Sequence, residues 1–263
     1  MVGCHNHPTA QNVQQAIQVS CNPYFYYVVR RIIQQGKDKN LYKDAEIGLN
    51  SWVDYMHSFG LGVRPAIDIY GVRSGLIPTV SFYDRWYGKH RWAWSTIRSN
   101  SIGQGEVKLT PLQMANLAAI FANRGYYYEP HFVKSIGDNG PLDIYTEKKK
   151  TMVDESYFTP VAEGMRRVVN EPGGTARRAR IKDIVVAGKT GTAQNPHGED
   201  HSVFIAFAPF DNPKIAIAVF VENAGFGGTW AAPIASLMIE KYLKGEIEDQ
   251  RKEKRILESE IIK

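Results

Sequence analysis

The chain is poor in cysteine and has no long apolar run. It has two cysteines among 263 residues, Cys4 and Cys21, which is too few for a disulfide-stapled scaffold. No stretch approaches the roughly 20 consecutive apolar residues of a membrane-spanning helix. The residues after Met1 lack the basic and apolar segments of a secretory leader. The sequence alone therefore predicts a folded segment with neither a membrane span nor a targeting signal, which means little if Met1 is not a natural start.

The residues that are present suit an ordinary folded domain with a basic excess. Hydrophobic residues make up 43% of the chain and charged residues 22%, as is usual for globular proteins. Lys and Arg outnumber Asp and Glu, so the net charge is 32 − 27 = +5. Two interpretations stay open: a solvated basic face, or a surface for an anionic ligand or polymer.

Periodicity predicts helices in the first two thirds of the chain and strands near its end. Helical patterns cover residues 9–20, 24–35, 44–59, 110–125 and 159–170, and a further amphipathic helix is expected over 230–243. Residues 202–209 and 214–223 are rich in β-branched and aromatic residues and predict an antiparallel pair. Residues 65–105 show no lasting period and are expected to form a functional or covering loop. The fold class predicted is α+β, an antiparallel β-sheet with helices on its faces.

The run "IVVAGKTGTAQN" at 184–195 places Lys189 among glycine and threonine residues. A phosphate-binding loop would need a glycine at position 183, which is Asp183, so the nucleotide interpretation fails. Two interpretations remain. Lys189, with the hydroxyls of Thr190 and Thr192 and the close backbone approach that Gly191 allows, suits a substrate carboxylate or an oxyanion. An ordinary turn would also account for this run taken alone.

The same chain carries Ser20-Cys21-Asn22 between two predicted helices. Ser-x-Asn followed by Lys-Thr-Gly is typical of the penicilloyl-serine transferases, whose third motif is Ser-x-x-Lys. The segments "HPTAQNVQQAIQVSCNPYF", "RSGLIPT", "NSIGQGEVKLTPLQMANLAAIFANRG", "NEPGGTA" and "FIAFAPFDNPKIAIAVFVEN" agree with this. Together they resemble the transpeptidase domain of elongation-type class B penicillin-binding proteins over residues 3–243. The resemblance implies the penicillin-binding protein/β-lactamase-like transpeptidase fold.

The chain differs from that family in one major respect, the absence of a Ser-x-x-Lys motif. No serine in the chain is followed three residues later by a lysine; Thr146 and Lys149 have the spacing, but with threonine and after Ser-x-Asn. The acylating serine and its general-base lysine are therefore expected outside these residues. We expect the chain to be the C-terminal part of the domain, truncated at its N-terminus, and inactive by itself. Residues 1–244 are assigned to the transpeptidase portion and 245–263 to a charged C-terminal tail.

The resemblance also implies roles for the residues that are present. Ser20 relays a proton between the leaving and acceptor amines, coupled to Lys189, and Asn22 hydrogen-bonds the substrate amide. Lys189, Thr190 and Thr192 hold the carboxylate of the donor peptide; Gly191 allows its close approach. The backbone N–H of Thr192 forms half of an oxyanion hole. The implied chemistry is acyl transfer through an acyl-serine, from a peptidoglycan D-Ala-D-Ala stem to an amine, inhibited by penicillin.

A second group of residues has the chemistry of a metal site. Cys4, His5, His7 and Cys21 offer thiolate and imidazole ligands that zinc prefers. No four-ligand spacing is visible, so two thiols outside any metal site, together with surface histidines, remain an alternative. Likeness to elongation-type relatives favours Cys21 and His7 as ligands of a structural zinc, with further ligands upstream of Met1. No cofactor is required for the implied chemistry.

The remaining expectations concern partners and location. The resemblance implies peptidoglycan stem peptides and β-lactams as ligands, and the elongation machinery with a glycosyltransferase as partners, at the periplasmic face of the bacterial inner membrane through an anchor that this chain lacks. The aromatic run "FYDRWYGKHRWAW" at 82–94 is either a glycan- or lipid-facing surface, a partner contact or a packed cover; nucleic acid has no support. Other function classes stay open: a non-catalytic remnant or scaffold, and a β-lactam-recognising hydrolase or sensor.

Overall fold

The computed structural model of the chain describes residues 3–4 and 6–261. They form two compact units. The first comprises Gly3, Cys4, residues 22–113 and residues 126–154, and the second comprises residues 6–21, 114–125 and 155–261. In the described part of the chain, no helix has both the length and the apolar character that crossing a membrane requires.

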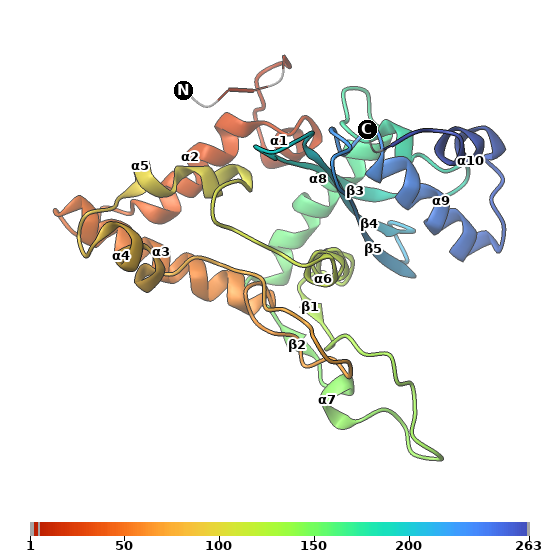
Figure 1. Cartoon of the computed structure of the whole chain (residues 1–263), viewed down its shortest axis with the longest axis horizontal. Coiled ribbons are helices and arrows are strands. Elements are labelled where there is room, and N and C mark those ends of the chain that lie inside the picture. The colour runs from red at the N-terminus through yellow and green to blue at the C-terminus, as the bar shows by residue number, and fades with distance from the viewer. Residues whose placement is uncertain (1–2, 5, 262–263) are drawn as a thin grey trace. The chain divides into compact units, whose positions relative to one another are not determined.

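The first unit is mainly helical (Figure 1). Its elements are α2 (Asn22–Ile33), α3 (Leu41–Ser58), α4 (Val80–Tyr87), α5 (Trp94–Ile97), the 3-10 helix η1 (Arg98–Ile102), β1 (Tyr126–Tyr127), α7 (Asp143–Thr146) and β2 (Lys149–Lys150). β1 and β2 pair antiparallel. The core of this unit contains Ile33, Leu49, Tyr83, Trp92 and Ile97, each at most 1% exposed.

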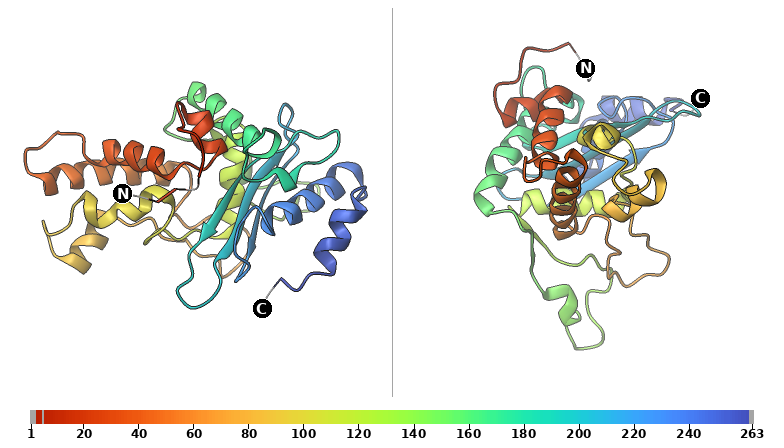
Figure 2. Two further views of the ribbon diagram at one scale, coloured as in Figure 1. Left: turned by 90° about the horizontal axis from the view of Figure 1, so that it is seen from above. Right: turned by 90° about the vertical axis from the view of Figure 1, so that its left-hand side faces the viewer.

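The second unit is built on an antiparallel sheet in the order β3-β4-β5, the strands being Ala187–Ala193, His201–Ala208 and Ile215–Val221. Helix α8 (Phe158–Asn170) packs on β3, and α9 (Ala231–Lys244) packs on β4 and β5. Figure 2 shows α8 and α9 on opposite sides of the sheet. Alternate residues of β4, Ser202, Phe204 and Ala206, are completely buried, because the pleat turns them all toward one covered face. The unit also contains α1 (Val13–Gln18), η2 (Glu155–Tyr157), η3 (Arg177–Ala179) and α10 (Gln250–Leu257).

Helix α6 (Pro111–Ala122) contains residues of both units. At its start, the backbone N–H of Gln113 donates to the Thr110 hydroxyl at 3.2 Å, and the N–H of Thr110 donates to the Gln113 side chain at 3.1 Å. This reciprocal pair is a capping box.

Three predictions about elements need correction. Residues 9–12 are not helical, since Asn12 caps α1 by accepting from the N–H of Gln15. Helix α8 begins at Phe158, one residue before the predicted helix over 159–170, so Thr159 and Pro160 lie inside it. Residues 65–105 are not a single irregular loop, because α4, α5 and η1 lie within them. Their helical turns are held by tertiary contacts such as the hydrogen bond from Trp92 Nε1 to Asp84, 2.8 Å long, which periodicity does not detect.

Candidate active site

Strand β3 carries the four residues predicted to bind a substrate, Lys189 to Thr192, in the order of the motif. It is an outer strand of the three-stranded sheet in the described part of the chain, and Lys189 lies opposite Ile205 of β4. Gly188 allows this strand to approach its neighbour. A Cβ at that position would come within 2.4 Å of the Phe204 ring and 2.6 Å of the Ile205 carbonyl oxygen. A side chain at 188 would therefore push the motif away from β4.

The Lys189 amine and the Ser20 hydroxyl meet, although the two residues are 169 positions apart. Lys189 Nζ donates to Ser20 Oγ at 2.9 Å and to the carbonyl oxygen of Thr190 at 2.7 Å. Ser20 follows α1 in the left-handed region, with φ of 55°. The backbone N–H of the next residue, Cys21, donates to the carbonyl of Ala16 at 2.9 Å, so the turn is closed by the helix that precedes it. This arrangement couples a hydroxyl to an amine within one compact unit.

Burial changes the acid–base character of Lys189. Removal of its amine from water lowers the pKa of Lys189 from 10.5 to about 8, because a low-dielectric environment disfavours the charged form. An amine with that pKa can hold or release a proton near neutral pH, whereas an exposed lysine stays charged. Lys189 can therefore attract an anion and exchange a proton with the Ser20 hydroxyl.

Thr175, which was not among the predicted site residues, adds a further hydroxyl to the site. Its hydroxyl shares a hydrogen bond of 2.7 Å with that of Thr190. Thr175 lies in the turn after α8, and the glycine at 228 lies against its carbonyl oxygen, where a Cβ would be only 2.4 Å away. Its sequence signal is its place in "NEPGGTA", one of the segments that resemble the family, although no role was predicted for Thr175 itself. Through this contact Thr175 positions Thr190.

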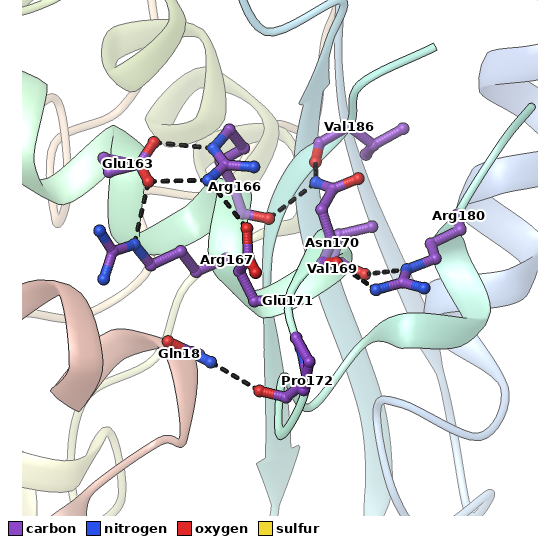
Figure 3. Close-up of polar contacts among 10 residues, drawn as sticks. All are labelled: Gln18, Glu163, Arg166, Arg167, Val169, Asn170, Glu171, Pro172, Arg180 and Val186. Atoms are coloured by element: carbon purple, nitrogen blue, oxygen red, sulfur yellow. Dashed lines mark hydrogen bonds and ion pairs between the residues drawn. The ribbon is translucent and has the colours of Figure 1, made fainter. Parts of the chain in front are cut away.

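A network at the end of α8 holds these segments together (Figure 3). The side chain of Gln18, two residues before Ser20, donates to the carbonyl of Pro172 at 2.8 Å. The side chain of Asn170 donates to the carbonyl of Val186, just before β3, at 2.8 Å. The C-terminal end of α8 thus holds in place both the segment that precedes Ser20 and the segment that precedes Lys189.

Charged side chains brace the same helix. Arg166 pairs with Glu163 at 2.8 Å and with Glu171 at 3.0 Å, and Arg167 pairs with Glu163 at 2.9 Å. Hydrogen bonds from Arg166, followed in importance by those from Arg167, lower the pKa of Glu163 to about 2. Glu163 therefore remains ionised through the physiological pH range, and the brace persists there.

Asn22, the other residue of Ser-x-Asn, begins α2 in the first unit. Its amide donates to the carbonyl of Gly3 at 3.0 Å. A role for Asn22 toward a substrate amide stays a prediction.

The second unit also contains the two residues favoured as metal ligands. The ligand atoms of His7 and Cys21 lie within 4.8 Å of each other, and Cys21 is 7% exposed. His7 Nδ1 lies 2.7 Å from the carbonyl oxygen of Pro8; such a contact at one ring nitrogen orients the other toward a metal. A thiol and an imidazole at this spacing fit zinc. His5 lies outside the described residues.

The sequence model of the family described as "Penicillin binding protein transpeptidase domain" matches residues 2–240. The chain belongs to this family. The transpeptidase fold and its antiparallel sheet, both predicted from the sequence, are thereby confirmed, and solved structures of penicillin-binding proteins superpose on the chain.

Individual members of the family are similar to the chain in sequence and in structure. The peptidoglycan D,D-transpeptidase MrdA of Haemophilus influenzae is 33% identical over 239 residues, covering 82% of this chain and 36% of its own length. Penicillin-binding protein 2 of Pseudomonas aeruginosa is 30% identical with a TM-score of 0.76, over 91% of this chain and 49% of that one. A complex of the same type of protein with MreC from Helicobacter pylori gives 25% identity and a TM-score of 0.71, over 89% of this chain and 40% of that one. The chain spans about a third of the length of its curated relatives.

Proposed function

We propose that this chain provides the substrate-holding part of a peptidoglycan D,D-transpeptidase active in cell-wall elongation. The observation that carries the proposal is the contact between Lys189 Nζ and Ser20 Oγ, 2.9 Å long, beside the hydroxyl pair of Thr175 and Thr190. One amine and several hydroxyls at the edge of a strand suit a peptide with a terminal carboxylate. The names of the curated relatives support the same substrate class.

In this mechanism the attacking serine comes from outside these 263 residues, since the chain has no Ser-x-x-Lys. Lys189, Thr190 and Thr192 bind the carboxylate of the D-Ala-D-Ala stem. Gly191 gives the peptide room, and Asn22 orients its amide. The serine gives its hydroxyl proton to its general-base lysine and forms an ester with the penultimate D-Ala as the C–N bond breaks, and Ser20 gives a proton to the departing D-Ala amine. The acceptor amine then attacks the ester. The new amide C–N bond forms as the C–O bond to the serine breaks, and the proton of the amine returns through Ser20 to the serine oxygen, while the N–H of Thr192 stabilises the oxyanion.

We assign the intact protein to the periplasmic face of the bacterial inner membrane, with penicillin and other β-lactams as inhibitors. The relative that was solved with MreC supports partners in the elongation machinery. A glycosyltransferase partner follows from the family resemblance alone. Within this proposal the 263-residue chain by itself catalyses no cross-linking.

Peptide binding by the chain tests the function. A short peptide ending in D-Ala-D-Ala should bind at least about tenfold more tightly with a free carboxylate than as its C-terminal amide, because hydrogen bonds to a charged group contribute about 1.5–3 kcal/mol. Titration calorimetry at pH 7 measures both affinities. The same peptide ending in L-Ala-L-Ala is the stereochemical control. Equal binding of the acid and the amide would refute the carboxylate clamp.

We also propose that His7 and Cys21 belong to a structural zinc site, to which Cys4, three residues before His7 in the chain, is a further candidate. When bound, zinc would brace the turn that carries Ser20. The chain purified without chelator should contain close to equimolar zinc by elemental analysis. Cys21→Ser and His7→Ala should each lower the zinc content at least about tenfold, because each removes a direct ligand.

The matched control for these variants is His197→Ala, which removes an exposed histidine of the same unit. It should leave the zinc content unchanged. Zinc content that stays equal in Cys21→Ser and the unmodified chain would show that no such site exists.

A further inference from the structure

The first unit carries an unusual concentration of exposed basic side chains at one end. Residues 22–44 and 80–98 contain nine exposed basic residues: Arg30, Arg31, Lys37, Lys39, Lys43, Arg85, Lys89, Arg91 and Arg98. We call this the basic end. It includes the end of α2, the beginning of α3, all of α4 and the loop that follows α4. The general basic excess of the chain therefore has a specific location.

Contacts within the first unit bring these segments together. Helix α2 packs on α3 and η1, and α3 packs on α4. The Trp94 indole donates to the Tyr26 hydroxyl at 3.1 Å, and His90 Nδ1 lies 3.1 Å from Glu46 of α3. Figure 1 and the left view of Figure 2 both show the end of α2, the start of α3 and α4 at the same end of this unit. The segments that carry most of these charges therefore lie together within the first unit.

The acidic residues of these two segments do not balance those charges. Asp44 accepts from the backbone N–H groups of Gly36 and Lys37, at 3.0 and 2.7 Å. Asp38 accepts from the N–H of Asn40, and Asp84 accepts from Trp92. None of the three is fully exposed, and no ion pair found among residues 3–4 and 6–261 uses any of the nine basic side chains. The basic end therefore presents uncompensated positive charge to solvent.

The basic end also contains exposed aromatic side chains. Trp86 is 71% exposed and Tyr27 is 58% exposed, whereas Trp92 and Trp94 of the same aromatic run are buried. Tyr27 lines a shallow surface hollow with Arg30, Arg31 and Gln34. The aromatic run at 82–94 therefore has two parts: Trp92 and Trp94 pack in the interior, and Trp86 faces solvent. Tyr27, outside this run, lies beside guanidinium groups. Flat rings beside fixed cations suit a ligand that has apolar faces and carboxylates.

We propose that the basic end binds a peptidoglycan strand, a glycan whose peptide stems carry carboxylates. The proposal rests on the proposed function, which makes that polymer the substrate. A peptidoglycan strand carries stems at intervals along its glycan, so one strand offers several carboxylates to the arginines and lysines of the basic end. Sugar rings stack on Trp86 and Tyr27, and the carboxylates of those stems pair with the arginines.

An anionic membrane would use the same kinds of side chain, so the experiment includes both ligands. The chain is titrated against fluorescent, uncross-linked peptidoglycan strands, and against vesicles of phosphatidylglycerol and phosphatidylethanolamine. In the charge variant, Arg30→Gln, Arg31→Gln and Lys89→Gln are combined; a second variant is Trp86→Ala. We expect about tenfold weaker strand binding for the charge variant, because exposed ion pairs contribute a few tenths to 1 kcal/mol each. Trp86→Ala should weaken strand binding severalfold.

Matched controls remove the same charge and the same type of ring elsewhere. Lys214→Gln, Lys241→Gln and Arg251→Gln, all exposed in the second unit, match the charge variant. Phe132→Ala, at a side chain that is 73% exposed, matches Trp86→Ala. Each control should change strand affinity less than twofold.

Several outcomes would overturn the proposal: no strand binding by the unmodified chain, equal losses in variant and control, or tighter binding of vesicles than of strands. The short D-Ala-D-Ala peptide separates this proposal from the proposed function, because it spans only the Lys189 site. Its affinity should be the same in the charge variant and the unmodified chain. Peptide binding without strand binding refutes the basic end alone; strand binding that depends on the basic end without peptide binding refutes the proposed function alone.

Discussion

Replacing Lys189 with methionine is expected to stabilise the chain at pH 7 while removing its affinity for a peptide carboxylate. Burial lowers the pKa of the Lys189 amine from 10.5 to about 8, so at pH 7 the fold holds a charge at a cost of up to about 3 kcal/mol. Methionine has a similar length without the charge. Its substitution leaves the Ser20 hydroxyl and the Thr190 carbonyl without a donor, which costs about 1 kcal/mol. We expect a net gain of about 1–2 kcal/mol in the free energy of unfolding.

The dependence on pH is diagnostic for Lys189. The folded chain releases the Lys189 proton near pH 8, whereas the unfolded chain keeps it up to about pH 10.5. Between these values the unfolded state binds more protons, so the stability of the unmodified chain rises with pH relative to that of Lys189→Met. The advantage of the variant should therefore be largest below pH 8 and shrink toward pH 10.5.

Urea unfolding at several pH values measures this difference, and calorimetry measures the loss of peptide binding, which should be at least about tenfold. Lys214→Met, at an exposed position, is the control and should change stability by less than about 0.5 kcal/mol at every pH. If Lys189→Met destabilised the chain equally from pH 7 to pH 10.5, the amine would not be desolvated in the way the structure indicates.

The second large effect is expected from Gly227→Ala. A Cβ at Gly227 would lie 2.3 Å from the carbonyl oxygen of Val203 and 2.4 Å from that of Gly191. Both are backbone atoms of paired strands, β4 and β3, so no side-chain rotation relieves the overlap. We expect a loss of about 2–4 kcal/mol in the free energy of unfolding. Because Gly191 lies between Thr190 and Thr192, the affinity for the peptide carboxylate should fall as well.

Thermal and urea unfolding measure the first effect, and peptide titration at a temperature where the variant is folded measures the second. Gly140→Ala is the matched control, since a Cβ there meets nothing within 4 Å and stability should change by less than about 0.5 kcal/mol. An alanine at 227 that is tolerated as well as one at 140 would contradict the packing of residue 227 on Gly191.

The sequence predicted most reliably the elements whose signals are local. The capping box of α6 lies in four consecutive residues, and β4 and β5 are continuous runs of β-branched and aromatic side chains. The Lys189 motif was selected by its residue types, and its partnership with Ser20 by resemblance to a family. Local patterns thus predicted strands of the sheet, and resemblance to a known family predicted that the two motifs act together.

What the sequence did not predict depends on contacts between distant residues. Thr175 belongs to the site because its hydroxyl meets Thr190, and nothing around Thr175 in the chain indicates that contact. Residues 245–263 were assigned only to a charged tail, and the contact of α10 with α9, where Lys252 Nζ lies 3.1 Å from the Ser236 hydroxyl, was not predicted. The boundary predicted at residue 244 stays a prediction. In each of these cases tertiary packing decides the structure, and periodicity does not report it.

The distance along the chain between Ser20 and Lys189 has a consequence for how the protein folds. Their hydrogen bond closes a loop of 169 residues, so it is among the most non-local contacts in the described structure. Contacts of such high sequence separation are slow to form, because the entropy of closing a long loop is lost before the contact contributes any stability. The β4–β5 hairpin needs only a short turn and can form early, whereas the amine and the hydroxyl meet only when α1 has packed on α8 and α8 on β3. Affinity for a peptide carboxylate should thus appear late in refolding, as a property of the completed fold rather than of any local segment.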